Sequence, residues 1–143
     1  MAYKLFVDTN VYLDFLMHRG TEWQHAEHVL ELAEKNNIEI FTSASCLLNL
    51  MYIMRSHKVS NNEIAIHVSN ILTYSKLANP DNIVFKTALS VGFSDPEDAV
   101  QYYTALQIKG IDYFISSNTK DFKKAPPQLP VITPRQFMTL YNK

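Results

Sequence analysis

Residues 5–11 read LFVDTNV, three apolar residues followed at once by an aspartate, a threonine and an asparagine. The apolar run predicts a strand over residues 3–7, and Thr9 or Asn10 is suited to cap a helix over residues 11–17. A strand that ends on an aspartate and passes straight into a helix is a β–α unit. The rest of the chain continues this alternation of strands and helices.

Apolar periodicity and turn residues place the remaining elements. We expect further strands at residues 38–42, 83–85, 113–116 and 131–132. We expect helices at residues 22–36, 43–55, 61–77 and 134–141, a helical turn or two at residues 87–91, and a helix opened by residues 94–98 that runs to residue 109, before Gly110. With this alternation and no internal repeat, residues 1–143 are predicted to form one α/β domain with a mainly parallel central sheet of four or five strands flanked by helices.

The composition excludes several classes of function. The chain has 143 residues, is 47% hydrophobic and has a formal net charge of −1, which excludes a globally basic nucleic-acid binder of the histone kind. The single cysteine, Cys46, excludes a disulfide framework and a four-cysteine zinc site. The three glycines are too far apart for a P-loop or a GxGxxG turn. Because no apolar run approaches the roughly 20 residues of a membrane span, we expect a soluble cytoplasmic protein with no membrane partner.

Acidic and amide side chains recur where the expected strands end. Parallel strands bring their carboxyl ends to one edge of the sheet, and such sheets bind ligands there. The residues that fall at this edge are Asp8, Asn49, Asp95, Asp98, Asn118 and Asp121. Carboxylates gathered in one crevice raise one another's pKa unless a cation neutralises them. Oxygen ligands without cysteine or histidine suit Mg²⁺ or Mn²⁺, so the pattern indicates a site for a hard divalent ion.

Each of these acids also has an ordinary structural role open to it. Asp8 is suited to cap the helix that follows it. Asp95 is placed as the N-cap of the next marked helix, with Pro96 as its first residue. Asp98 then holds the third helical position, from which a capping-box acid reaches back. Asp121, taken alone, reads as a solvated loop acid, so both kinds of role stay open at this point.

Asn49 is the one polar side chain within residues 47–54, in the helix that Ser43 or Ser45 caps. This helix is apolar almost all round, so we expect it to be buried on several sides, as core or as a dimer interface. A buried amide needs hydrogen-bond partners. For Asn49 these are either backbone groups or the carboxylate of Asp8 and a metal-bound water.

Two further features of the sequence are a lysine-rich run after the expected fourth strand and the single cysteine. Lys120, Lys123 and Lys124 adjoin the expected crevice, where they are placed to hold a phosphate backbone, although such a run is also ordinary solvated surface. Cys46 has no base near it in the sequence, so we interpret it as a small core residue and not as a nucleophile.

Three segments together resemble a known family. LFVDTNV at residues 5–11, SDPEDAVQ at residues 94–101 and ISSNTKDF at residues 115–122 are similar to the three signature blocks of PIN domains, in the same order and spacing. PIN domains are small α/β proteins with a mainly parallel sheet. Many are Mg²⁺- or Mn²⁺-dependent ribonucleases, including the VapC-type toxins of bacterial toxin–antitoxin pairs. The resemblance therefore implies an endoribonuclease, an antitoxin protein as partner and a homodimer.

The resemblance also implies roles for individual residues. Asp8 matches the family's first metal-binding acid, and Asp98 matches the third. The fourth falls at Asn118 or Asp121, of which Asp121 retains a carboxylate. The second acid is normally a glutamate, and Asn49 stands in its place. A subgroup of bacterial PIN domains resembles this chain in having asparagine there, in a similar SxxxxN setting.

On this interpretation the protein hydrolyses RNA phosphodiester bonds with Mg²⁺ or Mn²⁺ held by Asp8, Asp98 and Asp121. Asn49 completes the catalytic set by orienting Asp8 or a ligand water. The supporting residues are Asn10, Asp95, Ser116 and Asn118. Lys120 and Lys123 would position single-stranded or looped RNA, whose bases are splayed and readable, and the rings of Tyr102 and Tyr103 are available for base stacking or for helix packing.

Other functions fit the sequence less well or differently. A non-catalytic PIN-like module that binds RNA or protein is the main alternative, because Asn49 and Asn118 replace carboxylates. A phosphatase of the haloacid dehalogenase type needs a second aspartate two residues after Asp8, where this chain has Asn10. A response-regulator receiver needs its phosphorylated aspartate after the third strand and a neighbouring acid beside Asp8, which this sequence lacks.

Overall fold

The computed structural model describes residues 2–93 and 95–143; Ser94, which belongs to the second sequence block, lies outside the described residues. Within the described ranges five strands form one sheet in the order β3-β2-β1-β4-β5. Every neighbouring pair of strands is parallel. The strands are β1 (Lys4–Val7), β2 (Glu39–Thr42), β3 (Ser75–Leu77), β4 (Tyr113–Ile115) and β5 (Val131–Ile132). The predicted α/β fold with a parallel central sheet is confirmed.

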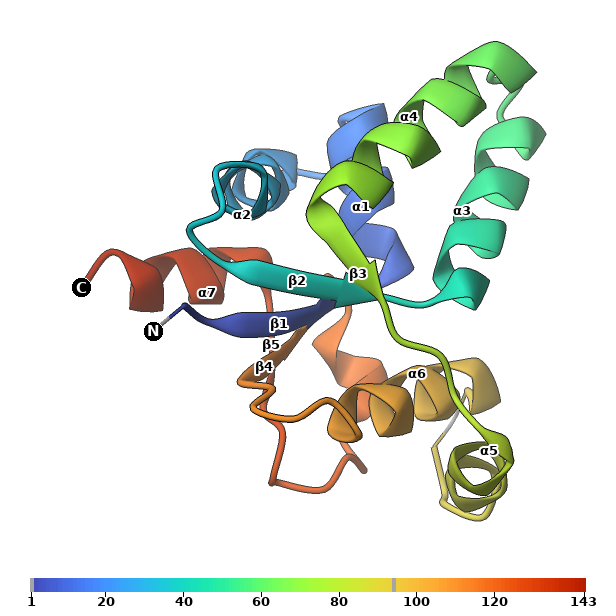
Figure 1. The fold of residues 1–143 in the computed structure, drawn as a ribbon, viewed down its shortest axis with the longest axis vertical. Coiled ribbons are helices and arrows are strands. Elements are labelled where there is room, and N and C mark those ends of the chain that lie inside the picture. Colours follow the sequence, from blue (N-terminus) through green and yellow to red (C-terminus); the bar gives the residue numbers. More distant parts are fainter. Residues whose placement is uncertain (1, 94) are drawn as a thin grey trace.

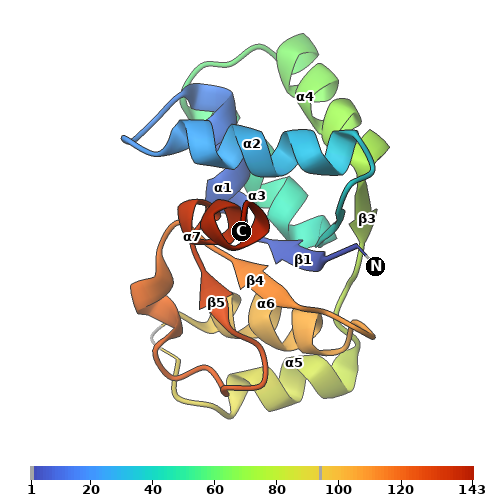
Figure 2. The ribbon, with the colours of Figure 1, turned by 90° about the vertical axis from the view of Figure 1, so that its left-hand side faces the viewer.

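Helices cover both faces of the sheet (Figures 1 and 2). They are α1 (Thr9–Met17), α2 (Trp23–Glu34), α3 (Ala44–Ser56), α4 (Asn61–Tyr74), α5 (Asn82–Leu89), α6 (Pro96–Leu106) and α7 (Pro134–Tyr141), with a short 3₁₀ helix, η1 (Thr119–Phe122), after β4. Figure 1 shows α1 to α4 on one side of the sheet and α5 and α6 on the other. Helix α7 packs against α2. None of the helices in the described ranges is long and apolar enough to cross a membrane.

The central strand β1 is buried on both of its faces, which is why it reads as a continuous apolar run. Successive side chains of a strand point to opposite faces. Leu5 and Val7 belong to the core beneath α1, α2 and α3. Phe6 points the other way and stacks on Phe114 of β4, with ring centroids 5.2 Å apart, in the core beneath α6. The strand is thereby fixed, and with it the position of the residue that follows it.

The third strand lies at a different place from the one predicted. Residues 83–85 belong to α5, because Oδ1 of Asp81 accepts a hydrogen bond from the backbone N–H of Val84 at 2.8 Å and so caps a helix there. The actual third strand, β3, follows α4 directly, and of its residues only Ser75 is buried. An edge strand this short and polar has no apolar run that would identify it. The β-branched residues Ile83 and Val84 are typical of strands, and for this reason the strand was predicted at residues 83–85.

Two expectations about helices are also corrected. Helix α1 begins at Thr9 and is capped by Asp8, not by Thr9 or Asn10. Ser43 caps α3 by accepting from the Cys46 N–H at 3.1 Å, but this helix is not buried on several sides. Leu48 is 62% exposed and Tyr52 is 72% exposed, so α3 presents one apolar face to the core and another to its surroundings.

Candidate active site

A cavity of about 390 Å³ lies beyond the carboxyl ends of β1 and β4. The chain leaves β1 toward β2 on one side and returns to it through β4 on the other, so the cavity sits where the strand order reverses. Its acidic lining residues are Asp8, Asp95, Glu97, Asp98 and Asp121, and its amides are Asn10, Asn49 and Gln101. Among the described residues, no lysine, arginine or histidine lines it. The sheet thus gathers most of the predicted site residues in one acidic cavity.

Asp8 serves both as a helix cap and as a site carboxylate. Its Oδ1 accepts a hydrogen bond from the Thr9 N–H at 2.8 Å. Its Oδ2 accepts one from the Ser116 hydroxyl at 3.1 Å, across the β1–β4 pairing. Ser116 in turn accepts from the Asn118 N–H at 3.1 Å. The Asp8 carboxylate is therefore buried and held from both sides where it lines the cavity.

Asp98 reaches the cavity from the first turn of α6. Asp95 caps this helix by accepting from the Glu97 N–H at 2.8 Å, and Pro96 occupies the first turn, as predicted. The capping-box role considered for Asp98 is not seen, since no hydrogen bond joins its carboxylate to another of the described residues. Its half-buried carboxylate therefore remains available to a ligand.

The fourth predicted position is shared by two residues. Asp121, in η1, lines the cavity, and its Oδ2 accepts a hydrogen bond from the side-chain amide of Asn118 at 2.7 Å. Asn118 itself is exposed and is absent from the cavity lining in the described chain. Of the two candidates, the carboxylate thus faces the cavity, and the amide orients it.

Crowding and burial raise the pKa of the two innermost carboxyl groups. Burial, with a smaller contribution from the charge of Asp121, raises the pKa of Asp8 to about 6 despite the hydrogen bonds that it accepts. Burial and then the charges of Asp8 and Asp95 raise the pKa of Asp98 to about 7. At pH 7 the Asp98 carboxyl therefore remains partly protonated, and a positive charge in the cavity would favour the ionised form of both groups.

The donor set suits Mg²⁺ or Mn²⁺ in a water-rich site. In residues 2–93 and 95–143 no group of three His, Cys, Asp or Glu side chains is arranged so that it can hold a metal ion by itself. Asp8, Asp98 and Asp121, which the sequence predicts as the residues that hold the ion, all line the cavity, and their role as ligands stays a prediction. Mg²⁺ commonly keeps several waters and takes one or two carboxylates together with substrate phosphates, which Asp8 and Asp98 can provide.

Asn49 was predicted to be buried, and this is wrong. It lies on the exposed side of α3, between Leu48 and Tyr52, and lines the cavity. Among the described residues, none forms a hydrogen bond with its side chain, so neither Asp8 nor a backbone group is its partner here. Because α3 buries only one face, the single polar residue of its apolar run is left at the rim of the site.

Gln101, the last residue of the second sequence block, lines the cavity, although no role was predicted for it. It is buried, its Oε1 accepts from the Ser43 hydroxyl at 2.7 Å, and its amide donates to the Ser45 hydroxyl at 2.7 Å. Gln101 lies one turn beyond Asp98, and Ser45 one turn before Asn49, so these bonds join the two helices that line the cavity. A glutamine among the apolar residues of α6 is the signal that could have identified it.

The remaining candidates lie at or outside the cavity. Lys120 and Lys123 are exposed on and just after η1, beside Asp121. Tyr102 is fully buried and its hydroxyl donates to the Leu129 carbonyl at 2.8 Å, so its ring serves packing and is not available for base stacking. Cys46 is buried, and burial raises the pKa of its thiol, which fits the core role predicted for it.

The metal-free protein is expected to lose stability as the pH rises from 5 to 8. The usual pKa of an aspartate side chain is 3.8. In the folded protein the pKa of Asp8 is raised to about 6 and that of Asp98 to about 7. Between these values the folded state holds protons that the unfolded chain has released, so their stabilising contribution is present below pH 3.8 and is lost as the pH passes through 6 and 7.

Asp98→Asn removes one of these groups and serves to measure the effect. In the presence of a chelator, calorimetry should show a melting temperature about 2–5 °C above wild type at pH 8 and a smaller rise at pH 5. Glu31→Gln, on the exposed face of α2, is the matched control and should follow wild type at both pH values. An equal change for Asp98→Asn at pH 5 and pH 8 would contradict the expectation.

The fold and the acidic cavity at the strand ends define the class of this protein. A family model of the PIN domain matches residues 4–120, and the chain belongs to the PIN domain family. It is 24% identical over 143 residues to Ribonuclease VapC1 of Aquifex aeolicus (strain VF5), a match that covers 97% of this chain and 96% of the relative.

Two solved structures share the fold. One is a toxin–antitoxin complex from Klebsiella pneumoniae, with a TM-score of 0.65 and 20% identity, over 91% of this chain and 97% of the other. The second is VapBC2 from Rickettsia felis bound to a DNA fragment from their promoter, with a TM-score of 0.66 and 16% identity, over 91% of this chain and 98% of the other. The VapC-like resemblance of the three sequence blocks is confirmed by these relatives.

Proposed function

We propose that this protein is a divalent-metal-dependent endoribonuclease, the toxin of a VapBC-type toxin–antitoxin pair, acting in the cytoplasm. The observation that carries the proposal is the acidic cavity, in which Asp8 and Asp98 have raised pKa values and, in the described chain, no basic side chain compensates them. The relative named as a ribonuclease and the toxin–antitoxin complexes that share the fold support the same function.

Asp8, Asp98 and Asp121 are the residues that would hold Mg²⁺ or Mn²⁺, with Asp121 acting through water because Asn118 already engages it. When bound, the ion supplies a water activated for attack and offsets charge on the phosphate. Asp8 is kept in place by Thr9 and Ser116, so it needs little reorganisation to accept the ion.

Asn49 and the lysines serve the substrate side of the site in this proposal. The free amide of Asn49 offers an oxygen to a bound water or an N–H to a phosphate from the rim of α3. Lys120 and Lys123 lie beside Asp121, where their charges attract the strand without lining the cavity. Single-stranded or looped RNA fits a site recessed at a sheet edge better than a duplex, because its backbone can bend into the cavity.

The proposed assembly is a homodimer that an antitoxin binds. Exposed apolar residues occur on α3, at Leu48 and Tyr52, and on α5. These two helices lie on opposite sides of the sheet (Figure 1), and both line the cavity. On α5, Ile83 is 74% exposed and Leu89 is 60% exposed. An apolar surface of this kind beside the site is typical of an interface between protein chains.

Replacing Tyr52 by glutamate is expected to weaken the dimer by about 10- to 100-fold, because a buried interface would then hold an unpaired charge. Sedimentation of the purified protein over a range of concentrations measures this. Ile66→Glu, which changes an equally apolar residue 58% exposed on α4, is the matched control and should leave the dimer intact. A monomeric wild-type protein, or equal effects of both variants, would exclude α3 as the interface.

The test of the function is cleavage of a total cellular RNA pool in the presence of Mn²⁺, with a chelator as control. A pool is used because a sequence-specific nuclease ignores most single oligonucleotides. We expect discrete fragments that disappear with the chelator, and heat of Mn²⁺ binding in calorimetry. Absence of both cleavage and Mn²⁺ binding would reject the nuclease.

The alternative function is a non-catalytic PIN module that binds RNA or protein. Two observations favour it: Asn49 replaces a carboxylate at the rim, and no three acidic side chains of the described residues form a ready metal site. Retention of RNA in a filter-binding assay, without cleavage and without Mn²⁺ binding, would select this function over the nuclease.

A further inference from the structure

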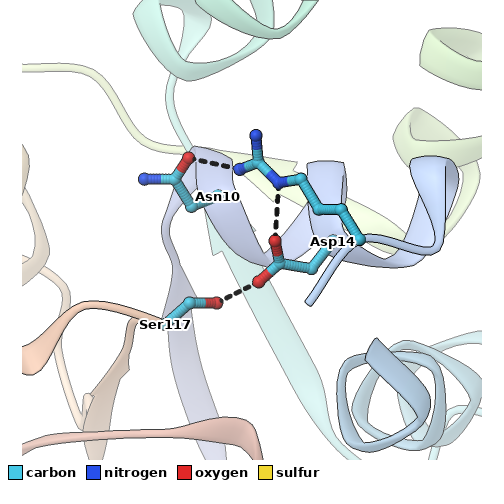
Figure 3. A network of polar contacts seen from close by, with 4 residues as sticks. Asn10, Asp14 and Ser117 are labelled. Atoms are coloured by element: carbon cyan, nitrogen blue, oxygen red, sulfur yellow. Dashed lines mark hydrogen bonds and ion pairs between the residues drawn. The ribbon is translucent and has the colours of Figure 1, made fainter. Parts of the chain in front are cut away.

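A polar network joins the cavity to the end of α1 (Figure 3). Arg19 Nη2 donates to Oδ1 of Asn10 at 2.7 Å, and Arg19 Nε donates to Oδ1 of Asp14 at 2.7 Å. The hydroxyl of Ser117 donates to the other oxygen of Asp14 at 2.6 Å. Of these four residues only Asn10 lines the cavity in the described chain. The network therefore ends in one side chain of the site.

The chemistry of arginine fixes which way the Asn10 amide faces. A guanidinium has five N–H donors and no acceptor, so the group of Asn10 that meets it must be the carbonyl oxygen. The amide nitrogen then lies on the opposite side of the group, as Figure 3 shows. Among the described residues, none accepts a hydrogen bond from this nitrogen. Asn10 thus holds an unused N–H donor at a cavity whose other lining groups are mostly carboxylates.

The backbone holds Arg19 in the position that this contact needs. His18 ends α1 in the left-handed conformation, with φ of 46°, which turns the chain back on the helix. The backbone N–H of Arg19 then donates to the carbonyl of Asp14 at 3.1 Å. The hydroxyl of Ser117 donates to the side-chain carboxylate of Asp14 and so links it to the loop after β4. This loop also carries Ser116 and leads to Asp121. The contact between Arg19 and Asn10 is therefore supported both by the end of α1 and by the loop after β4.

We infer that Arg19 is a positioning residue, which with Asp14 and Ser117 holds the Asn10 amide N–H toward the cavity as a donor to a phosphate oxygen of the bound strand. This inference rests on the proposed function for the nature of the substrate. In a cavity lined by carboxylates, a neutral donor fixed in place favours a phosphate without competing for the metal. An Asn10 free to rotate would present its oxygen to the phosphate for part of the time.

The kinetic test compares four variants: Asn10→Ala, Asn10→Asp, Arg19→Met and Arg19→Met combined with Asn10→Ala. Loss of a hydrogen bond to a charged group lowers kcat/KM by about 10- to 100-fold, and we expect this for Asn10→Ala and for Arg19→Met. Asn10→Asp should lose more, because it points a carboxylate at the phosphate. The double variant should be no slower than Asn10→Ala alone, since Arg19 acts through Asn10.

Two further variants separate positioning from general stability. Arg19→Lys keeps a donor for the Asn10 oxygen and should recover part of the loss. Arg135→Met removes an arginine whose guanidinium contacts Glu22 at 3.1 Å on the exposed surface, and should cleave as wild type does. Loss of activity by Arg19→Met that is undiminished in the Asn10→Ala background would overturn the inference.

A second measurement does not depend on RNA. In nuclear magnetic resonance spectra the side-chain amide of Asn10, assigned from its absence in Asn10→Asp, should show the 15N relaxation of a fixed group in wild type and that of a mobile group in Arg19→Met. An unchanged Asn10 in Arg19→Met would overturn the inference even if the enzyme is active. If only the proposed function is wrong, the result differs. The wild-type protein then leaves the RNA pool intact, while the Asn10 amide still becomes mobile in Arg19→Met.

Discussion

Replacing Asp8 by asparagine is expected to reduce RNA cleavage by about 1,000-fold, the order of loss seen when one group that stabilises developing charge is removed. Asp8 is the most deeply buried carboxylate of the cavity, and it is held by Thr9 at the start of α1 and by Ser116 just after β4. Asparagine keeps the shape of the side chain but removes its charge, so the attraction for a divalent ion falls. The measurement is the rate of fragment release from the RNA pool with Mn²⁺.

The same variant should fold at least as well as wild type, which makes its loss of activity interpretable. Asparagine caps helices as well as aspartate does, so the bond from the Thr9 N–H is retained. Its amide can also meet the Ser116 hydroxyl, and the desolvated charge behind the raised pKa of Asp8 is gone. Glu31→Gln is the control for loss of one charge elsewhere. Cleavage by Asp8→Asn at the wild-type rate would mean that the activity belongs to a contaminant or to another site.

Replacing Asn49 by glutamate is expected to raise the affinity for Mn²⁺ by about 10- to 100-fold, because it adds a negative charge to the lining of the cavity that holds Asp8 and Asp98. The exposed position of Asn49 at the cavity rim leaves room for the longer side chain. Titration calorimetry at pH 7.5 measures the change. Asn62→Glu, on the exposed start of α4, adds the same charge away from the cavity and should leave the affinity unchanged.

The outcome for Asn49→Glu decides how the departure from the usual acidic residue is understood. A gain in affinity, with cleavage maintained or increased, would mean that Asn49 occupies the position of the missing acid. An unchanged affinity would mean that α3 does not direct this residue at the ion, and that the metal depends on Asp8, Asp98 and Asp121 alone.

The sequence was sufficient to predict the sheet and most of the acidic cavity. A parallel sheet gathers the residues after its strands at one edge, so Asp8, Asp98 and Asp121 could be brought together from order alone. It was not sufficient for β3, whose residues are too polar and too few to stand out from the end of α4. It also misplaced Asn49, since an apolar run does not reveal whether one face of a helix lacks a covering partner.

The side-chain hydrogen bonds around the cavity could not be predicted from the sequence, for a different reason. The contacts of Arg19 with Asn10 depend on the left-handed turn at His18, and a histidine in that conformation has no sequence signal. The bonds of Gln101 to Ser43 and Ser45 join helices whose relative position is set only when the whole sheet forms. The sequence shows that these polar residues are present, but only the distances in the folded structure show which of them form hydrogen bonds with one another.

The place of β1 in the middle of the sheet has a consequence for the ribosome that makes this protein. Asp8 emerges early in synthesis, but its partners Ile115 and Ser116 lie more than 100 residues later in the chain. Until β4 emerges and adds to β1, the nascent chain carries Asp8 and Asp98 but neither Ser116, which holds Asp8, nor Asp121. Because the β1–β4 pairing joins segments so far apart in the chain, the site can be completed only after β4 has been made, late in synthesis.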